Sequence, residues 1–434
     1  MLKVVIVSLT AGGGHKTAMY SLGQSLQAFA PQVSAEYYLS PSQKLEHTHR
    51  IVYTKFVRLY NLGYRLIEYA LPQLLYRFFS GSLVREIREE LRPLMLRTDI
   101  EVIISTHFMQ TDALLQLKHE LNSPVKIIIY IPDFDLSTVH FPRYKNLQAD
   151  AVLAQSPALL EKLGRDFGVS PDDRQQAGYL PRSEFGAARM LSREEARQRV
   201  AKFKMPLAET VSENAYTIVA TGGAYWVSLL HKQLSRLAAS EKFNWKESQI
   251  LVACGNNAAA YQAYTSLRAV HPQARIIPLP FLNYEQMSFV LRSADTTVLS
   301  GIAPATMYEL IECEAGPVII HRINPGPERY NLEYVLSRNL MTYIPDALDL
   351  VHFLENLSHD KSNLKSLREA FLKAAATERQ GAMERAVKNA AFIQHIAARA
   401  QADHRADAQT GDQTGTQADN QSGDQTRNQV HDQA

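Results

Sequence analysis

Short runs of apolar residues recur along the chain, and each ends in glycine or polar residues before a segment of helical composition begins. The run Val4–Val7 leads into three glycines and His15, and two later runs end at His107 and Asp133. A continuous apolar run predicts a strand buried on both faces, and strands that alternate with helices predict a parallel sheet. We therefore expect an α/β fold built from doubly wound, Rossmann-type sheets. Further strands are predicted at residues 33–39, 151–153, 176–178, 216–220, 249–253, 275–279, 296–299 and 317–320.

The length of the chain indicates two such sheets. A chain of 434 residues exceeds one ordinary hydrophobic core, and a second series of strands begins after Met205-Pro206. We expect a first domain over residues 1–190, a second over 205–375 that faces it across a cleft, and a C-terminal helix over 376–400. Residues 401–434 are rich in Gln, Asp, Thr and Gly and have almost no large apolar side chains, so we expect a disordered tail.

Charge and cysteine content narrow the class of protein. The formal net charge is +2, and the tail carries six Asp and two Arg, which leaves about +6 on the rest of the chain. This balance gives no case for nucleic acid as a partner. Cys254 and Cys313 are too few for a disulfide framework, which fits a reducing cytoplasm. No apolar stretch reaches the ~18 residues of a membrane span, so contact with a membrane is expected only from its surface.

Residues 48–97 combine aromatic and basic side chains at helical spacing. One interpretation is a pair of helices whose aromatic stripe packs into the domain core. The other is an amphipathic patch in which arginines meet anionic lipid and aromatic rings anchor at the interface. The residues of this patch are Tyr53, Phe56, Arg58, Tyr60, Arg65, Arg77, Phe78 and Phe79.

The glycine turn after the first strand is a candidate ligand site. Gly12, Gly13 and Gly14 let another molecule approach the main chain closely, and the helix that follows presents unpaired N–H groups to an anion or a polar sugar. The spacing matches neither the dinucleotide pattern nor a P-loop. His15, His107 and Asp133 are expected near one another, because parallel strands deliver their carboxyl ends to one edge of the sheet. The alternative is that they cap strands and satisfy loop amides.

Seven sequence elements occur in the order seen in one enzyme family. Together they resemble the monogalactosyldiacylglycerol synthase and processive diacylglycerol glucosyltransferase group of glycosyltransferase family 28, over about residues 1–350. The elements are Ala11-Gly-Gly-Gly-His15, Pro132-Asp133-Phe134, Gly222-Gly223, Cys254-Gly255-Asn256-Asn257, Pro280-Phe281-Leu282 with Met287 and Ala294-Asp295, Thr306-Met-Tyr-Glu309, and Pro325-Gly-Pro-Glu328-Arg-Tyr-Asn331.

This resemblance implies a GT-B fold, a nucleotide-sugar donor held mainly by the second domain, an acceptor held by the first, inversion at the sugar and no obligatory metal or other cofactor. Residues 53–79 resemble the membrane-facing acceptor region of the family. Gly12, Gly13, Gly14 and His107 are assigned to an acceptor or phosphate loop. The donor residues that the resemblance implies are Gly222, Gly223, Asn257, Phe281, Leu282, Thr306, Glu309, Glu328 and Asn331.

The implied donor site is chemically consistent, since glycine loops before helix N-termini supply backbone donors to a departing diphosphate without a metal. Glu309 is placed to accept the ribose hydroxyls, although Thr306 and Glu309 also have the spacing of a helix capping box. Three positions depart from the family. Ala303-Pro304 replaces a Gly-Gly pair of the family, Asn256 replaces an arginine, and Pro327 replaces a glutamine. The change to Ala303-Pro304 removes conformational freedom from the loop and one backbone N–H donor.

The resemblance predicts an inverting hexosyltransferase that carries a sugar from a UDP-sugar to a lipid hydroxyl such as that of diacylglycerol. Its expected partners are the UDP-sugar, the lipid acceptor and an anionic membrane surface, to which the cytoplasmic protein binds peripherally. The alternatives are a polyprenyl-linked or soluble acceptor, a sugar-nucleotide epimerase, or a non-catalytic relative that binds nucleotide sugar or lipid. For the general base we expect His15 with Asp133 assisting, the alternative being Asp133 alone with a pKa raised by burial.

Overall fold

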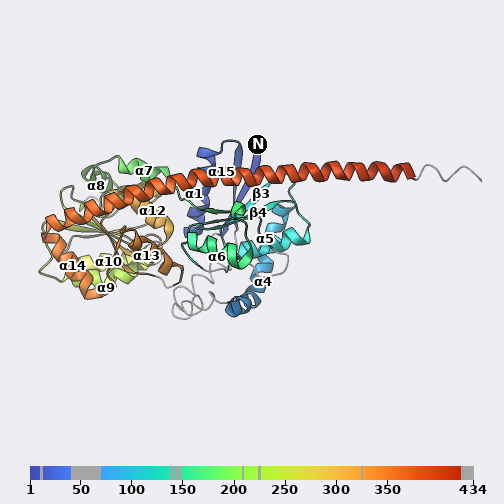
Figure 1. Cartoon of the computed structure of the whole chain (residues 1–434). Coiled ribbons are helices and arrows are strands. Elements are labelled where there is room, and N and C mark those ends of the chain that lie inside the picture. Colours follow the sequence, from blue (N-terminus) through green and yellow to red (C-terminus); the bar gives the residue numbers. More distant parts are fainter. Residues whose placement is uncertain are drawn as a thin grey trace, which may run out of the picture.

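The computed structural model describes residues 1–9, 13–40, 70–136, 139, 141, 148–207, 210–222, 226–323 and 326–421, without the side chains of residues 13, 70–80, 327, 361 and 404–421. Within these ranges the chain forms two halves, each built on a six-stranded sheet in which every strand pair is parallel. The two halves lie side by side, with helices on both faces of each sheet (Figure 1). The predicted α/β fold of two doubly wound sheets is confirmed.

The first sheet has the strand order β2-β1-β3-β4-β5-β6. Its strands are β1 (Leu2–Leu9), β2 (Val33–Ser40), β3 (Val102–Ser105), β4 (Lys126–Ile131), β5 (Ala151–Ala154) and β6 (Arg174–Gln176). Its helices are α1 (Gly13–Phe29), α4 (Ala70–Met95), α5 (Phe108–Glu120) and α6 (Pro157–Phe167). Apart from the first residues of β1 and β4, the central strands are buried, because helices cover their continuous Val and Ile runs on either face.

The second sheet has the strand order β12-β11-β10-β7-β8-β9. Its strands are β7 (Tyr216–Thr221), β8 (Ser248–Ala253), β9 (Ile276–Leu279), β10 (Thr296–Ser300), β11 (Val318–Arg322) and β12 (Thr342–Tyr343). Its helices are α9 (His231–Ala238), α10 (Ala258–Val270), α11 (Tyr284–Arg292), α12 (Pro304–Glu312), α13 (Pro327–Ser337) and α14 (Ala347–His359). Only β12 lacks a counterpart among the predicted strands, because two residues carry no periodicity.

Residues 177–182 connect the two halves and lead into α7 (Ser183–Arg189) and α8 (Arg193–Ala201), which pack on α11. This linker passes directly against the last helix of the chain. A Cβ on Gly178 would lie 2.3 Å from the backbone nitrogen of Ala386, so only glycine permits the approach.

The last helix, α15 (Lys361–Gln421), spans both halves. Figure 1 shows it running along one side of the molecule and continuing past the first half. It contacts α12 and α14 of the second half and α1, β1, β3, β4 and β6 of the first. Residues 401–421, which we assigned to the tail, continue this helix, while residues 422–434 lie outside the described residues. The tract has no proline, and its Ala and Gln residues are compatible with a helix.

None of the helices in the described part of the chain is long and apolar enough to cross a bilayer.

Candidate active site

Each sheet has a topological switch point, where the strand order reverses and where open α/β sheets bind their ligands. In the first sheet this point lies between β1 and β3, and in the second between β7 and β10. His15 follows β1 and His107 follows β3, whereas Gly222 follows β7 and Gly301 follows β10. The fold therefore brings the predicted residues to the edges where ligands are expected.

His15 lies in the first turn of α1 and is held by the backbone beyond β3. Its Nδ1 atom lies 2.7 Å from the carbonyl oxygen of Thr106. A carbonyl oxygen only accepts hydrogen bonds, so Nδ1 carries the proton, and in the neutral ring Nε2 keeps the lone pair. Thr106, rather than Asp133, thus accepts the second ring proton. His15, at the carboxyl edge of the first sheet, therefore has the tautomer that suits a general base.

His107 lies beside His15, as the parallel sheet predicted. The two rings meet edge to face with their centroids 5.0 Å apart. His107 is also the N-cap of α5, where its Nδ1 accepts a hydrogen bond from Met109 N at 3.3 Å, and its ring stacks on Phe108. The capping alternative therefore holds for His107. Within the described residues His15 caps no helix, so it is the better candidate of the two for the general base.

Gly14 stands in the same turn as His15. A Cβ built there would meet no atom of the described residues within 4 Å. The packing of the protein does not demand glycine at this position, so the open space is available to a ligand that approaches the start of α1.

Asp133 follows β4 and connects the first half to the second. Its Oδ1 accepts a hydrogen bond from Asn331 Nδ2 at 3.1 Å, and Asn331 Nδ2 also donates to Ile302 O at 3.0 Å. Asn331 Oδ1 in turn accepts from Phe134 N at 3.0 Å. Asn331 is 1% exposed. This single amide fixes the end of β4 against the loop that leads into α12.

Glu309 lies in the second turn of α12 and is partly buried. Burial raises the pKa of its carboxyl from 4.5 to about 7, and the Arg182 guanidinium opposes this shift. The capping-box alternative for Thr306 and Glu309 is wrong, because the N-cap of α12 is Ala303, three residues before Thr306, and it makes no side-chain cap. Glu309 is thus not needed to begin the helix.

Two polar residues of the linker face the same region and were not predicted. Arg182 is 9% exposed, and its guanidinium lies 3.5 Å from the ring centroid of Tyr284 and 5.5 Å from that of Tyr20. Within the described part of the chain, its Nη1 atom has no hydrogen-bond partner, and neither has the hydroxyl of Tyr179, which is 1% exposed. Buried polar groups normally have partners. Unpaired groups next to Glu309 therefore indicate a site for a polar ligand.

Gly222 is required by the turn after β7. A Cβ there would lie 2.3 Å from Val227 N, because the chain folds back so that Trp226 N donates to Gly222 O at 3.0 Å. Asn257 is the N-cap of α10, and its Oδ1 accepts from Ala260 N at 3.0 Å. Its side chain therefore caps a helix in this structure.

The remaining implied donor residues occupy different environments. Phe281 is 60% exposed, whereas Leu282 is 9% exposed and belongs to the core. Glu328 lies in the first turn of α13, facing Gly301, where a Cβ would come within 3.5 Å of its Oε1. Gly301 has φ +91°, a conformation that favours glycine.

The departure at Ala303-Pro304 does not disrupt the start of α12. Pro304 occupies N1, a position at which proline is favoured because the missing N–H has no intrahelical partner. The N-terminus of α12 therefore still lies after β10, at the switch point of the second sheet, with one backbone donor fewer than a Gly-Gly pair would give.

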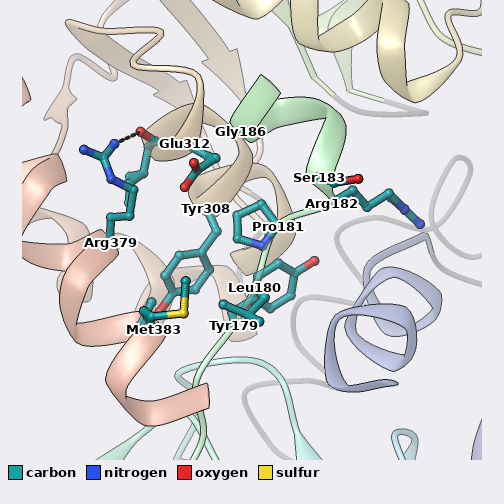
Figure 2. Close-up of a pocket in the computed structure, with 12 residues that line it drawn as sticks. Tyr179, Leu180, Pro181, Arg182, Ser183, Gly186, Tyr308, Glu312, Arg379 and Met383 are labelled. Carbon is teal, nitrogen blue, oxygen red and sulfur yellow. Dashed lines mark hydrogen bonds between the residues drawn. The ribbon is translucent and has the colours of Figure 1, made fainter. Parts of the chain in front are cut away.

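A cavity of about 190 Å³ lies behind this region, between the linker, α12 and α15. Figure 2 shows Tyr308 and Met383 beside Leu180 and Pro181, while the side chain of Arg182 extends away from them. Arg379 Nη1 donates to Ile311 O at 3.5 Å at its edge. The cavity shares Tyr179 and Arg182 with the region around Glu309, but neither His15 nor Asp133 lines it.

Several predicted residues lie outside the described residues: Gly12, Gly223, Tyr53, Phe56, Arg58, Tyr60 and Arg65. Arg77, Phe78 and Phe79 belong to the first part of α4, whose side chains are not described. The interfacial patch therefore remains a prediction. Among the described residues, no three His, Cys, Asp or Glu side chains form a metal-binding group, and independence from metal also remains a prediction.

No protein-family model matches the chain. A processive diacylglycerol beta-glucosyltransferase of Bacillus pumilus (strain SAFR-032) is 24% identical over 375 residues, covering 85% of this chain and 89% of the relative. The uncharacterized glycosyltransferase YkoN of Bacillus subtilis (strain 168) is 29% identical over 141 residues, covering 32% and 35%. The resemblance to this group of glycosyltransferases is confirmed.

Solved structures share the fold at low identity. S. aureus MnaA, in a co-structure with UDP, gives a TM-score of 0.58 at 13% identity over 91% of this chain and 98% of the other. MurG of Acinetobacter baumannii gives a TM-score of 0.50 at 13% identity, over 92% of this chain and 99% of MurG. UDP-GlcNAc 2-epimerase from Neisseria meningitidis, bound to UDP-GlcNAc, gives a TM-score of 0.53 at 9% identity, over 87% of this chain and 98% of the epimerase. These similarities confirm the GT-B architecture.

Proposed function

We propose that the protein is an inverting glycosyltransferase that moves a hexose from a UDP-sugar to the hydroxyl of a lipid such as diacylglycerol. The observation that carries the proposal is the bridge through Asn331, which joins Asp133 at the edge of the first sheet to Ile302 before α12. It supports a single site to which the histidine side and the Glu309 side both belong. The name of the Bacillus pumilus relative supports a hexose donor and a diacylglycerol acceptor.

The donor is held by the second half and the linker. The Glu309 carboxylate accepts hydrogen bonds from the ribose hydroxyls, and the Arg182 guanidinium balances the charge of the diphosphate. Backbone N–H groups at the start of α12 and after Gly222 stabilise the negative charge that develops on the leaving group.

The acceptor hydroxyl approaches at the start of α1. His15 Nε2 removes its proton as the oxygen attacks the anomeric carbon from the face opposite the diphosphate. The new bond between carbon and acceptor oxygen forms while the bond to the phosphate oxygen breaks, so UDP leaves and the configuration inverts. Thr106 holds the imidazole in the reactive tautomer through its carbonyl oxygen.

The proposal is tested with purified protein, a panel of labelled nucleotide sugars and a total lipid extract, with products resolved by mass. The expected product is a glycolipid that carries one or more hexoses and appears only with both substrates. If free sugar is released and no lipid fraction yields a glycolipid, the proposal of a lipid acceptor is contradicted.

The same assay separates the alternatives, one of which is suggested by the epimerases among the proteins of similar fold. An epimerase would convert the nucleotide sugar to an isomer with no lipid present. A non-catalytic relative would bind UDP in calorimetry without consuming any donor.

Membrane association is a separate part of the proposal, because it rests on residues 48–97. Replacing Arg58, Arg65 and Arg77 by alanine should weaken binding to anionic vesicles, at about 1 kcal/mol per basic residue at low salt. Vesicle flotation measures this. Unchanged flotation with an unchanged thermal unfolding curve would place the aromatic segment in the core instead.

A further inference from the structure

A buried carboxylate of α15 lies where the two halves meet. Glu378 is 6% exposed. Its Oε1 accepts hydrogen bonds from Tyr334 OH at 2.7 Å and Tyr308 OH at 3.2 Å, and pairs with Arg385 Nη2 at 2.7 Å. Arg338 Nε lies 3.4 Å from Oε2. A buried charge needs such partners, and they fix its position in return.

The first partner leads to the end of β4. The ring of Tyr334, on α13, stacks on Phe134 with centroids 3.5 Å apart and planes 20° from parallel. Phe134 is the neighbour of Asp133, and its N–H donates to Asn331. The position of the Tyr334 ring therefore sets the position of the loop that carries Asp133.

The second partner leads to the donor side. Tyr308 precedes Glu309 on α12, and its ring stacks on Tyr179 of the linker with centroids 5.0 Å apart and planes 5° from parallel. Tyr179 and Arg182 belong to the same short linker. The hydroxyl of Tyr308 thus ties the helix that carries Glu309 to α15.

We propose that Glu378 is a positioning residue, which holds the Asp133 loop and the Glu309 helix in register by binding Tyr308 of the Glu309 helix and Tyr334 of α13, whose ring stacks on Phe134 of the Asp133 loop. The proposal rests on the proposed function for the meaning of these two elements. Among the described residues, the partners of Glu378 are the two tyrosines and two arginines, and none of these four is a residue assigned to the donor or the acceptor. A single carboxylate therefore couples the geometry of the base side to that of the donor side.

The matched variants are Glu378→Gln and Glu355→Gln. Glu355, on α14, is 7% exposed and bonded to Ser240 and His352, but it packs in the second half away from the linker. Both changes remove one buried charge and keep the side-chain shape. A merely structural role predicts the same result for both, namely a lower Tm with unchanged kinetics.

We expect Glu378→Gln to lower kcat about tenfold and to raise the donor Kd about tenfold, whereas Glu355→Gln changes only Tm. The tyrosines separate the two effects. Tyr334→Phe keeps the stack on Phe134 but loses the bond to Glu378, and should lower kcat alone. Tyr308→Phe should weaken donor binding alone. These milder variants also keep the test valid if Glu378→Gln does not fold.

Hydrogen exchange followed by mass spectrometry provides a readout that does not need turnover. Peptides covering residues 126–136 and 304–312 should exchange faster in Glu378→Gln than in the wild type, and at the wild-type rate in Glu355→Gln. Wild-type exchange in both peptides, with wild-type kcat and Kd, would overturn the positioning role. Faster exchange in a protein that turns over no donor would sustain the mechanical coupling and refute the proposed function instead.

Discussion

The ionisation of Glu309 should link the stability of the protein to pH. Its pKa is about 7 in the folded protein, against an ordinary value of 4.5. One pKa unit corresponds to about 1.36 kcal/mol, so this difference could change the free energy of unfolding by at most about 3.4 kcal/mol. The carboxyl is only partly buried, so screening by solvent reduces the effect to roughly 1–2 kcal/mol.

The direction follows from proton binding. Between pH 4.5 and 7 the folded protein keeps the Glu309 proton while the unfolded chain releases it, so the free energy of unfolding falls as pH rises through this window. Glu309→Gln removes this dependence and retains the shape. Urea unfolding should therefore be measured at pH 5, 6, 7 and 8. From pH 5 to pH 8, the free energy of unfolding of the wild type should fall by about 1–2 kcal/mol relative to that of Glu309→Gln.

Binding of UDP provides the complementary measurement. The ribose hydroxyls donate to the carboxylate, so the wild-type affinity for UDP should increase from pH 5 to pH 8 relative to Glu309→Gln. Glu355→Gln serves as the control. Parallel stability curves for wild type and Glu309→Gln would refute the raised pKa, and parallel affinity curves would refute contact between Glu309 and the ribose.

Three further predictions concern the base, the glycine turns and the C-terminal helix. His15→Ala should lower turnover by about 10²–10⁴-fold with little change in UDP affinity, whereas His119→Ala, on the exposed end of α5, should be silent in the same assay. Gly222→Ala should lower Tm by several degrees because its Cβ meets Val227 N at 2.3 Å, whereas Gly14→Ala should leave Tm unchanged or higher and reduce turnover if the acceptor approaches that turn. Truncation after Ala400 removes the ion pair between Asp403 and Lys126, so calorimetry should show a loss of no more than about 1 kcal/mol.

The strands could be predicted from sequence because buried parallel strands are continuous apolar runs, and His15 and His107 could be paired because both follow such runs. Side-chain contacts between the two halves could not be predicted. Asn331 bonds Asp133 across 198 positions of sequence, and no local pattern records this. The capping box at Thr306 was wrong because Pro304 begins the helix earlier, an alternative with equal local support.

The arrangement of α15 also has a consequence for synthesis of the chain. Ile393, Ile396 and Ala397 are buried in the same core as Val4 and Ala18, so the first half lacks part of its interior until the C-terminal helix leaves the ribosome. Adding residues 177–393 takes about 10–40 s at ~5–20 residues per second. During that interval the nascent first half exposes the apolar surface that α15 later covers, and chaperones that bind such surfaces have time to act on it.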